Sequence, residues 1–430
     1  MSNTVAARKI LVPIFNRAHY GRLRSVLRAI KSHPKLELQL MVASAAASDY
    51  FWLNLKHSQP HSWRKSLPAY IRAKALAWAD RVKPGAVFKD DFVARNVLAD
   101  GYEIHSRIPL FFDGGVPETM AKSVGLGIVG LVDELKRLGP DIVFINADRF
   151  EMMAVALAAA YLNIPIAHNE AGDVSGTIDE SIRHAITKLA HVHFTVTEAS
   201  RRRVIQMGEN PDYVFTVGSP AIDAIKDLNT RVAKISFAGS VVPNPYLLVL
   251  LHPVTTESPE ANYLMAKNVS DVLHELNMPT IFLGSNIDAM SAKVGEIIRD
   301  LRENFSSSHS GKTDSRGQIF VVKNLPPDDF YRLLANTACA IGNSSSFIRE
   351  GAYFGTPVVL VGTRQQNRER GENVVTVGIS AAEIKESIAR QLNHGRYARD
   401  AMFGDGGASE RIAKILAEAR PKIQKKFIGS

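Results

Sequence analysis

The sequence predicts an α/β protein with two Rossmann-like, doubly wound domains, each built on a parallel sheet. Three observations support this fold class. Short runs of branched apolar residues alternate with segments of helical period, which is typical of parallel strands joined by crossover helices. The alternation occurs in two series, and a polar, proline-containing stretch separates them. With 430 residues and 46% hydrophobic residues, the chain is long enough for two or three cores.

The first series opens with a strand, a helix and a second strand. Lys9–Phe15 has the composition of a buried strand, and Leu36–Ala43 is the next one. Between them, the apolar residues fall on one helical face, and Pro34 ends the helix: Leu23, Val26, Leu27 and Ile30. Further strands are predicted at Asp141–Asn146, Ile164–His168 and His191–Thr197.

The second series has five predicted strands with helical segments between them: Tyr246–His252, Thr280–Gly284, Gln318–Val322, Ala340–Asn343 and Pro357–Gly362. The boundary is predicted near Ile225–Asn244, where a helix gives way to the polar stretch Ala238–Pro245. We therefore expect an N-terminal domain at 1–225 and a C-terminal domain at 226–405.

Residues from Ser44 to about Thr119 do not follow this alternation and are predicted to be a basic, partly helical insertion. Between Asn54 and Arg95 there are nine Lys/Arg and three Asp/Glu, so most of the net charge of +9 lies there. All three tryptophans lie in it too: Trp52, Trp63 and Trp78. Either this is a solvated basic face with tryptophans packed on the parent domain, or it is a lid, an oligomer contact or a surface for anionic membranes.

Composition excludes several classes of protein. One cysteine, Cys339, rules out an internal disulfide framework and is typical of a reducing compartment, where it is expected to be a small buried core residue. The start of the chain lacks a continuous apolar signal segment, and Asn163 and Pro165 interrupt the most apolar stretch, so we expect a cytoplasmic protein with no membrane span. No stacking pattern or reader motif accompanies the basic segment, which argues against nucleic acid.

Polar clusters follow two strands of the first series, where ligands of doubly wound sheets bind. Asn16–Gly21 opens a helix whose first amides favour phosphate, and Arg17 adds a positive charge. Asn146–Arg149 places a carboxylate and a guanidinium at the same edge. Asp148 is either a site residue or a helix N-cap.

A third and longer cluster runs from His168 to Leu189. Its apolar stripe is Ile182, Ile186 and Leu189, which leaves a neighbouring face with three polar residues four apart: Asp179, Arg183 and Thr187. The alternative is that Asp179 and Arg183 form a simple surface ion pair. Four nearby histidines do not complete a metal site and are interpreted as core or wall residues, so no metal is expected: His168, His184, His191 and His193.

Two strand ends of the second series carry matching features. His252 follows one strand and is a candidate ligand contact. Gly342–Ser346 follows another and opens a helix, where small hydroxylated residues and free amides can bind a diphosphate, although a plain serine N-cap explains one of them. Within that helix, Glu350 could hold the two hydroxyls of a ribose.

The run Gly176–His191 resembles the hydrolysing UDP-N-acetylglucosamine 2-epimerases that feed sialic-acid pathways. Four further segments resemble the nucleotide half of that family: Gly342–Ser345, Arg349–Glu350, Phe354–Pro357 and Gly362–Gln365. The resemblance implies the glycosyltransferase-B architecture, with two Rossmann-like domains facing a central cleft and a C-terminal helix at 406–430 packing back on the first domain. It implies no metal and no nicotinamide cofactor.

The resemblance also implies a reaction and a set of site residues. The catalytic carboxylates would be Asp148, Glu170 and Asp179. Substrate contacts would come from Arg17, Arg149, His168, His252, Asn286, Leu325, Ser344, Ser345, Glu350 and Arg364. The expected reaction eliminates UDP from a UDP-amino sugar and hydrates the resulting glycal to the free 2-epimer, an N-acetylmannosamine type of sugar. A homodimer or homotetramer is expected.

Departures from the family pattern fall on the sugar side. His19 replaces an acidic residue, Asn146 and Ala147 replace a His-Gly pair, and Asn169 with Ala171 alters a glycine-rich turn. A modified sugar, such as a diacetamido-trideoxyhexose, or a different nucleoside therefore stays open. Two other functions also stay open: a glycosyltransferase of the same architecture, and a nucleotide-sugar-binding protein without catalysis.

Overall fold

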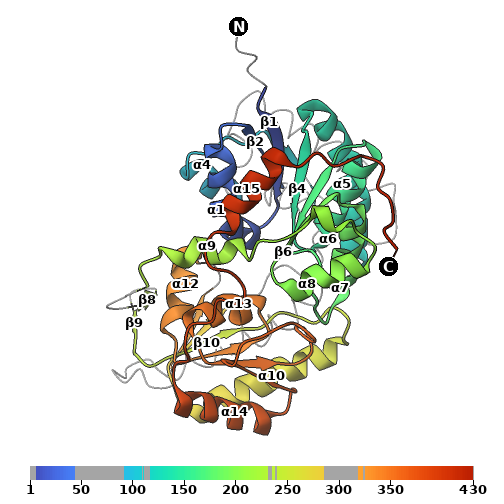
Figure 1. Cartoon of the computed structure of the whole chain (residues 1–430). Helices are drawn as coiled ribbons and strands as arrows, with labels where there is room; N and C mark the ends of the chain where they lie inside the picture. Colours follow the sequence, from blue (N-terminus) through green and yellow to red (C-terminus); the bar gives the residue numbers. More distant parts are fainter. Residues whose placement is uncertain are drawn as a thin grey trace, which may run out of the picture. The chain divides into compact units, whose positions relative to one another are not determined.

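The computed structural model describes residues 6–43, 92–108, 110, 117–230, 235–237, 240–284, 318–322 and 325–429. The chain divides into two compact units, each with its own parallel sheet (Figure 1). The first unit contains residues 1–173, 181–224 and 407–430, and the second contains 174–180 and 225–406. The predicted class, α/β with two Rossmann-like domains, is confirmed.

The first unit is built on a seven-stranded sheet of order β3-β2-β1-β4-β5-β6-β7, in which every neighbouring pair is parallel. Its strands are β1 (Arg8–Ile14), β2 (Leu36–Ala43), β3 (Ser106–Ile108), β4 (Ile142–Asn146), β5 (Ile166–Asn169), β6 (Val192–Thr195) and β7 (Val214–Thr216). The order reverses between β1 and β4, and this switch point is where doubly wound sheets bind their ligands.

Helices cover both faces of this sheet. They are α1 (Arg17–Ser32), α4 (Phe92–Ala99), α5 (Pro117–Leu138), α6 (Phe150–Tyr161), α7 (Ile178–Leu189), α8 (Glu198–Gln206), a 3-10 turn at Pro211–Tyr213, α9 (Pro220–Lys226) and α15 (Ala408–Glu418). One face packs on α1, α4 and α15, and the other on α5 and α6. The strands β1 and β4 at its centre are largely apolar because both of their faces are buried.

The second unit repeats the design with six parallel strands in the order β12-β11-β10-β13-β14-β15. The strands are β10 (Leu247–Leu250), β11 (Thr280–Leu283), β12 (Ile319–Val322), β13 (Cys339–Gly342), β14 (Val358–Val361) and β15 (Val374–Val377). Its helices are α10 (Pro259–Leu276), α12 (Pro327–Asn336), α13 (Ser345–Phe354) and α14 (Ala381–His394). The switch point lies between β10 and β13, and Cys339 is fully buried, as expected.

Short edge elements differ from the prediction. The strands β3, β7 and β15 were not predicted, and neither was an antiparallel hairpin of β8 (Ile235–Phe237) and β9 (Ser240–Val242). In the expected insertion, β3 pairs with β2 as part of the first sheet, so this portion follows the sheet after all. The three tryptophans and most of the basic excess lie outside the described residues.

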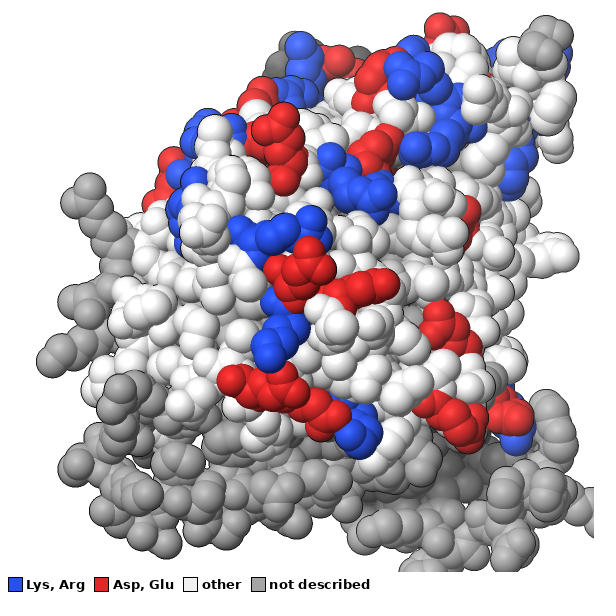
Figure 2. Space-filling view, turned by 90° about the horizontal axis from the view of Figure 1, so that it is seen from below, with Lys and Arg blue, Asp and Glu red and all other residues white. Residues whose placement is uncertain are grey.

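Two surface properties bear on the expected partners. No helix among the described residues is long and apolar enough to span a membrane. On the face drawn in Figure 2, the described Lys and Arg side chains are interspersed with Asp and Glu. A continuous basic surface of the kind that binds nucleic acid is therefore not formed by the described residues of that face.

Candidate active site

Two residues with unusual backbone conformations lie at the same edge of the first sheet. Ala147 and Glu170 follow the adjacent strands β4 and β5, and both have a φ of +62°. Few residues other than glycine adopt this left-handed conformation, which costs on the order of 1 kcal/mol and is common at functional sites. Glu170 is only 3% exposed, and its Oε1 lies 3.9 Å from Nη1 of Arg22 on α1.

Asp148 pairs with a buried arginine. Arg183 on α7 is 1% exposed, makes an ion pair with Asp148, and donates from Nη1 to the Asp173 carbonyl oxygen at 2.7 Å. The N-cap of α6 is Arg149, so Asp148 does not have the capping role that was the alternative. The alternative, in which Asp179 and Arg183 form a simple surface ion pair, is wrong, because the Arg183 guanidinium is buried beside Asp148.

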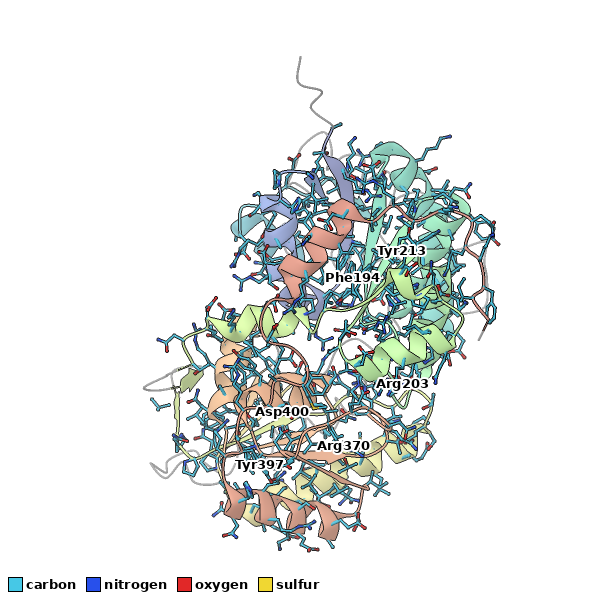
Figure 3. The ribbon with its side chains drawn as sticks, in the orientation of Figure 1. Phe194, Arg203, Tyr213, Arg370, Tyr397 and Asp400 are labelled. Atoms are coloured by element: carbon cyan, nitrogen blue, oxygen red, sulfur yellow. The ribbon has the colours of Figure 1, made fainter. Side chains whose placement is uncertain are left out.

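The loop after Glu170 is fixed by α8. Asp173 accepts a hydrogen bond from the Ser200 hydroxyl at 2.8 Å, and Arg203, labelled in Figure 3, donates to the Gly172 carbonyl oxygen at 3.0 Å. Gly172 has a φ of +74°, and a Cβ there would lie 2.3 Å from the Ser200 carbonyl oxygen. Only glycine fits at this position.

His168 is fully buried, and both of its ring nitrogens are engaged. Nε2 lies 2.8 Å from the Ala147 carbonyl oxygen, and Nδ1 lies 3.1 Å from the Thr187 hydroxyl. Burial lowers the pKa of this imidazole to about 3, so the ring is neutral. Nε2 therefore carries the proton that the Ala147 carbonyl oxygen accepts, which leaves Nδ1 as an acceptor beside the Thr187 hydroxyl, and that hydroxyl donates to the Arg183 carbonyl oxygen at 2.9 Å. This arrangement holds Ala147 in its left-handed conformation.

Arg149 and His19 complete the surroundings of Glu170, the first as a cation and the second as a neutral ring. Arg149 donates from Nε to both carboxylate oxygens of the fully buried Glu151, each at 3.1 Å. His19, in the first turn of α1, is 2% exposed. Its pKa falls to about 3, first because the ring is buried and then because Arg149 and Arg22 are near, and Glu170 opposes this shift.

In the second unit, the side-chain amide of Asn343 joins the ends of β10 and β13 at the switch point. Asn343 accepts from the His252 backbone N–H through Oδ1 and donates to the His252 carbonyl oxygen through Nδ2, both at 2.7 Å. Arg364 and Gln365 donate to the Asn343 carbonyl oxygen at 3.2 and 3.1 Å. Three of the predicted contacts, His252, Ser344 and Arg364, are therefore gathered around one strand end.

Helix α13 begins at this strand end. Ser344 is its N-cap and accepts from the Ser346 backbone N–H, so one serine has the plain capping role. Ser345 is the first helical residue, and Glu350 lies fully buried on the second turn. Gly342 has a φ of +144°, and a Cβ there would lie 2.0 Å from the Leu250 carbonyl oxygen, so only glycine allows β10 and β13 to approach this closely.

The remaining predicted residues are distributed as follows. Leu325 is half-buried in the loop before α12, and Asp179 is half-buried in the first turn of α7. Arg17 begins α1, but its side chain lies outside the description, and Asn286 lies outside the described residues altogether. A cavity of about 830 Å³ in the second unit contains none of the predicted residues, although it is lined by Gly362 and Thr363 beside Arg364.

The first unit has a second cluster of charges, which sequence reasoning did not identify. Glu209 is 2% exposed and accepts hydrogen bonds from Lys188 at 2.5 Å, His193 at 3.0 Å and Lys425 at 2.6 Å. Burial alone would raise its pKa, but these three donors lower the pKa to about 2. The cluster connects the end of α7 with the segment after α15. No local sequence pattern predicts a contact between residues so far apart in the chain.

Two doubly wound sheets, with charged and amide side chains at their switch points, define an α/β protein of the class that binds nucleotides. The family model described as UDP-N-acetylglucosamine 2-epimerase matches residues 88–417. The chain belongs to the UDP-N-acetylglucosamine 2-epimerase family.

Individual relatives agree with this assignment. The chain is 34% identical over 322 residues to the UDP-N,N'-diacetylbacillosamine 2-epimerase (hydrolyzing) of Legionella pneumophila, covering 74% of this chain and 82% of that protein. It is 27% identical over 433 residues to the UDP-N-acetylglucosamine 2-epimerase of Neisseria meningitidis, covering 98% and 99%. Among solved structures, the Methanocaldococcus jannaschii UDP-GlcNAc 2-epimerase in complex with UDP-GlcNAc and UDP has a TM-score of 0.69 at 18% identity, covering 96% and 100%.

Proposed function

We propose that the protein is a hydrolysing 2-epimerase, which converts a UDP-N-acetylamino sugar into the free 2-epimer and UDP. The observation that carries this proposal is the pair of acidic residues at the ends of adjacent strands, Glu170 beside Arg22 and Asp148 beside Arg183. Carboxylates held in different surroundings suit proton removal and proton delivery. Family membership supports a UDP-sugar substrate, and the name of the Legionella relative supports release of the free sugar.

The chemistry requires two groups that exchange protons. In the elimination, a base takes the proton from carbon 2, the electron pair forms the C1–C2 double bond, and the C1–O bond breaks with UDP as the leaving group. Water then adds its hydroxyl to carbon 1, and an acid delivers a proton to the opposite face of carbon 2. Arginines and backbone amides stabilise the charge that develops on the diphosphate.

We assign the roles as follows. The acid and base come from Asp148, Glu170 and Asp179, the last being one helical turn before Arg183 on α7. The nucleotide is bound by the second unit, through Ser344, Ser345 and Arg364 around the start of α13, together with His252, Glu350, Leu325 and Asn286. Arg17 and Arg149 bind the diphosphate. His168 positions the backbone of Ala147 rather than touching the substrate.

The test is turnover in heavy water with two donors, UDP-N-acetylglucosamine and a UDP-diacetamido-trideoxyhexose. The proposal expects free sugar with deuterium at carbon 2 and inverted configuration there, together with stoichiometric UDP. Asp148→Asn and Glu170→Gln should each lower kcat at least about 100-fold, since each removes a group that transfers a proton. Asp212→Asn, an exposed aspartate of the same unit, is the matched control and should turn over like the parent.

Each alternative gives a different outcome. Deuterated UDP-sugar without free sugar would indicate epimerisation with the nucleotide retained, and would overturn the hydrolytic step. Turnover that depends on an acceptor, without deuterium at carbon 2, would indicate a glycosyltransferase. UDP binding without turnover in any variant would indicate a binding protein.

A further inference from the structure

Two asparagines at the carboxyl edge of the first sheet form a buried amide pair. Asn146 ends β4 and Asn169 ends β5, and the parallel register places them opposite each other. Each is 1% exposed, and Nδ2 of Asn169 donates to Oδ1 of Asn146 at 2.7 Å. Nδ2 of Asn146 and Oδ1 of Asn169 have no hydrogen-bond partner among the described residues.

The two amide atoms outside the hydrogen bond, Nδ2 of Asn146 and Oδ1 of Asn169, are one donor and one acceptor. Turning both side-chain amides by 180° would keep the hydrogen bond within the pair and exchange the partners. Turning only one would set two oxygens or two NH₂ groups against each other. The amide pair therefore presents one N–H and one C=O in either orientation.

A third buried polar atom lies on the sheet face that carries the amide pair. Side chains alternate along a strand, so Asn146 points to the same face as Phe144, and Asn169 to the same face as Ala167. Both of those residues belong to the core that packs on α1. His19 is in the first turn of that helix, and its Nδ1 also lacks a partner among the described residues.

Buried polar atoms of this kind need a partner. Leaving a buried donor or acceptor unsatisfied costs about 1–3 kcal/mol, so the two amide atoms at the strand edge, and the ring nitrogen of His19 near Glu170 and Arg149, require either bound water or a ligand. The two asparagine amides carry no charge. Burial lowers the pKa of His19 to about 3, so its ring is neutral at pH 7 as well. Neutral groups with one donor and one acceptor do not match a phosphate, which offers only acceptors, but they match a secondary amide.

We propose that Asn146 and Asn169 bind an acylamino group of the sugar, accepting its N–H on one amide and donating to its C=O from the other, with His19 lining the same subsite. The proposal rests on the proposed nucleotide-sugar function and adds a specificity determinant to it. By the resemblance described under the sequence, all three residues are positions at which this chain departs from the family's pattern. The acylamino group is either the one on carbon 2 or a second one elsewhere on the ring.

The test is affinity for three donors, measured by calorimetry in a Glu170→Gln background that prevents turnover: UDP-glucose, UDP-N-acetylglucosamine and a UDP-diacetamido-trideoxyhexose. The variant is Asn146→Leu with Asn169→Leu, because replacing both hydrogen-bonded partners by apolar groups of similar shape costs little stability. We expect Kd to rise roughly 10- to 100-fold for donors whose acylamino group the pair binds, which corresponds to about 1.4–2.8 kcal/mol.

The pattern among donors identifies the source of the group. A loss confined to the diacetamido donor assigns the pair to a second acylamino group, whereas an equal loss for both amide donors assigns it to the group on carbon 2. UDP-glucose and UDP alone should bind the variant as they bind the parent, and UDP affinity also reports that the variant is folded. Unchanged Kd values for all three donors would overturn the proposal and leave a bound water as the partner.

If the double variant fails to bind UDP, His19→Phe provides the same comparison with one smaller change. The proposal then expects a loss of affinity for the same amide donors, and an unchanged donor preference would contradict it. Because binding is measured without turnover, the outcome is separate from that of the proposed reaction. An inactive protein that still discriminates among the donors would refute the reaction and keep the subsite.

Discussion

Acidification should destabilise the first unit through two buried histidines. Burial lowers the pKa values of His19 and His168 to about 3, whereas a histidine in an unfolded chain titrates near 6.5. Between pH 6.5 and 3 the unfolded state therefore binds more protons, and the free energy of unfolding falls as pH falls. At pH 5 the loss is about 2 kcal/mol for each histidine, or about 4 kcal/mol together, relative to pH 7.5.

The assay is hydrogen–deuterium exchange at the imidazole C2 position, resolved by peptide mass spectrometry from pH 3 to 8, because its rate depends on the protonation of each ring. The same sites in the urea-unfolded chain provide the reference. Urea unfolding followed by circular dichroism at pH 7.5 and 5 gives the change in stability, and His19→Asn should reduce the pH-dependent loss by about 2 kcal/mol. An exchange midpoint near 6.5 for His19 or His168 in the folded protein would refute the reasoning.

Three further substitutions test other parts of the structure, each by urea unfolding. Arg183→Met should lower the free energy of unfolding by about 3–5 kcal/mol because it leaves Asp148 without its buried ion-pair partner. Adding Asp148→Asn should recover part of that loss. Full additivity of the two changes would contradict the pairing. Gly342→Ala should lower the free energy of unfolding by at least about 3 kcal/mol because its Cβ would overlap the backbone of β10. Gly351→Ala, within α13, meets ordinary contacts and should raise the free energy of unfolding by up to about 1 kcal/mol. Equal effects of the two substitutions would contradict this account. Glu209→Gln should destabilise by about 3 kcal/mol at pH 7 because its buried carboxylate holds three donors, and no change at neutral pH would exclude that role.

The central strands could be predicted from sequence because strands buried on both faces consist mainly of apolar residues. Leu247–Leu250 is buried at every position, and such a strand reads as an uninterrupted apolar run. Val374–Val377 lies at the edge of the second sheet and is only partly buried, and Val214–Thr216 has three residues, so neither has a pattern distinct from a loop. Edge strands depend on neighbours that a local pattern does not contain.

The candidate site could be predicted in part for a similar reason. Polar residues directly after a buried strand, such as Asp148 and Glu170, stand out because the strand end is where ligands bind. Their partners could not be predicted, because the pairing of Arg183 with Asp148 requires α7 to pack beside the end of β4. The regular spacing of polar residues along α7 indicated a functional face, but it did not identify which contacts that face makes.

The first unit is completed by residues from the far end of the chain. Ile412 and Leu416 of α15 lie in the same core as the strands β1 and β4, and Arg8 donates to the Leu416 carbonyl oxygen at 2.8 Å. Asp223 accepts from the first two backbone N–H groups of α15, and Lys425 joins the buried cluster around Glu209. The sheet edge followed by Asp148 and Glu170 therefore depends on residues 407–429, although these residues contribute no predicted substrate contact. Because this contribution is one of packing, a search for catalytic motifs does not find it, and substitutions in α15 should reduce activity through the stability of the first unit rather than through its chemistry.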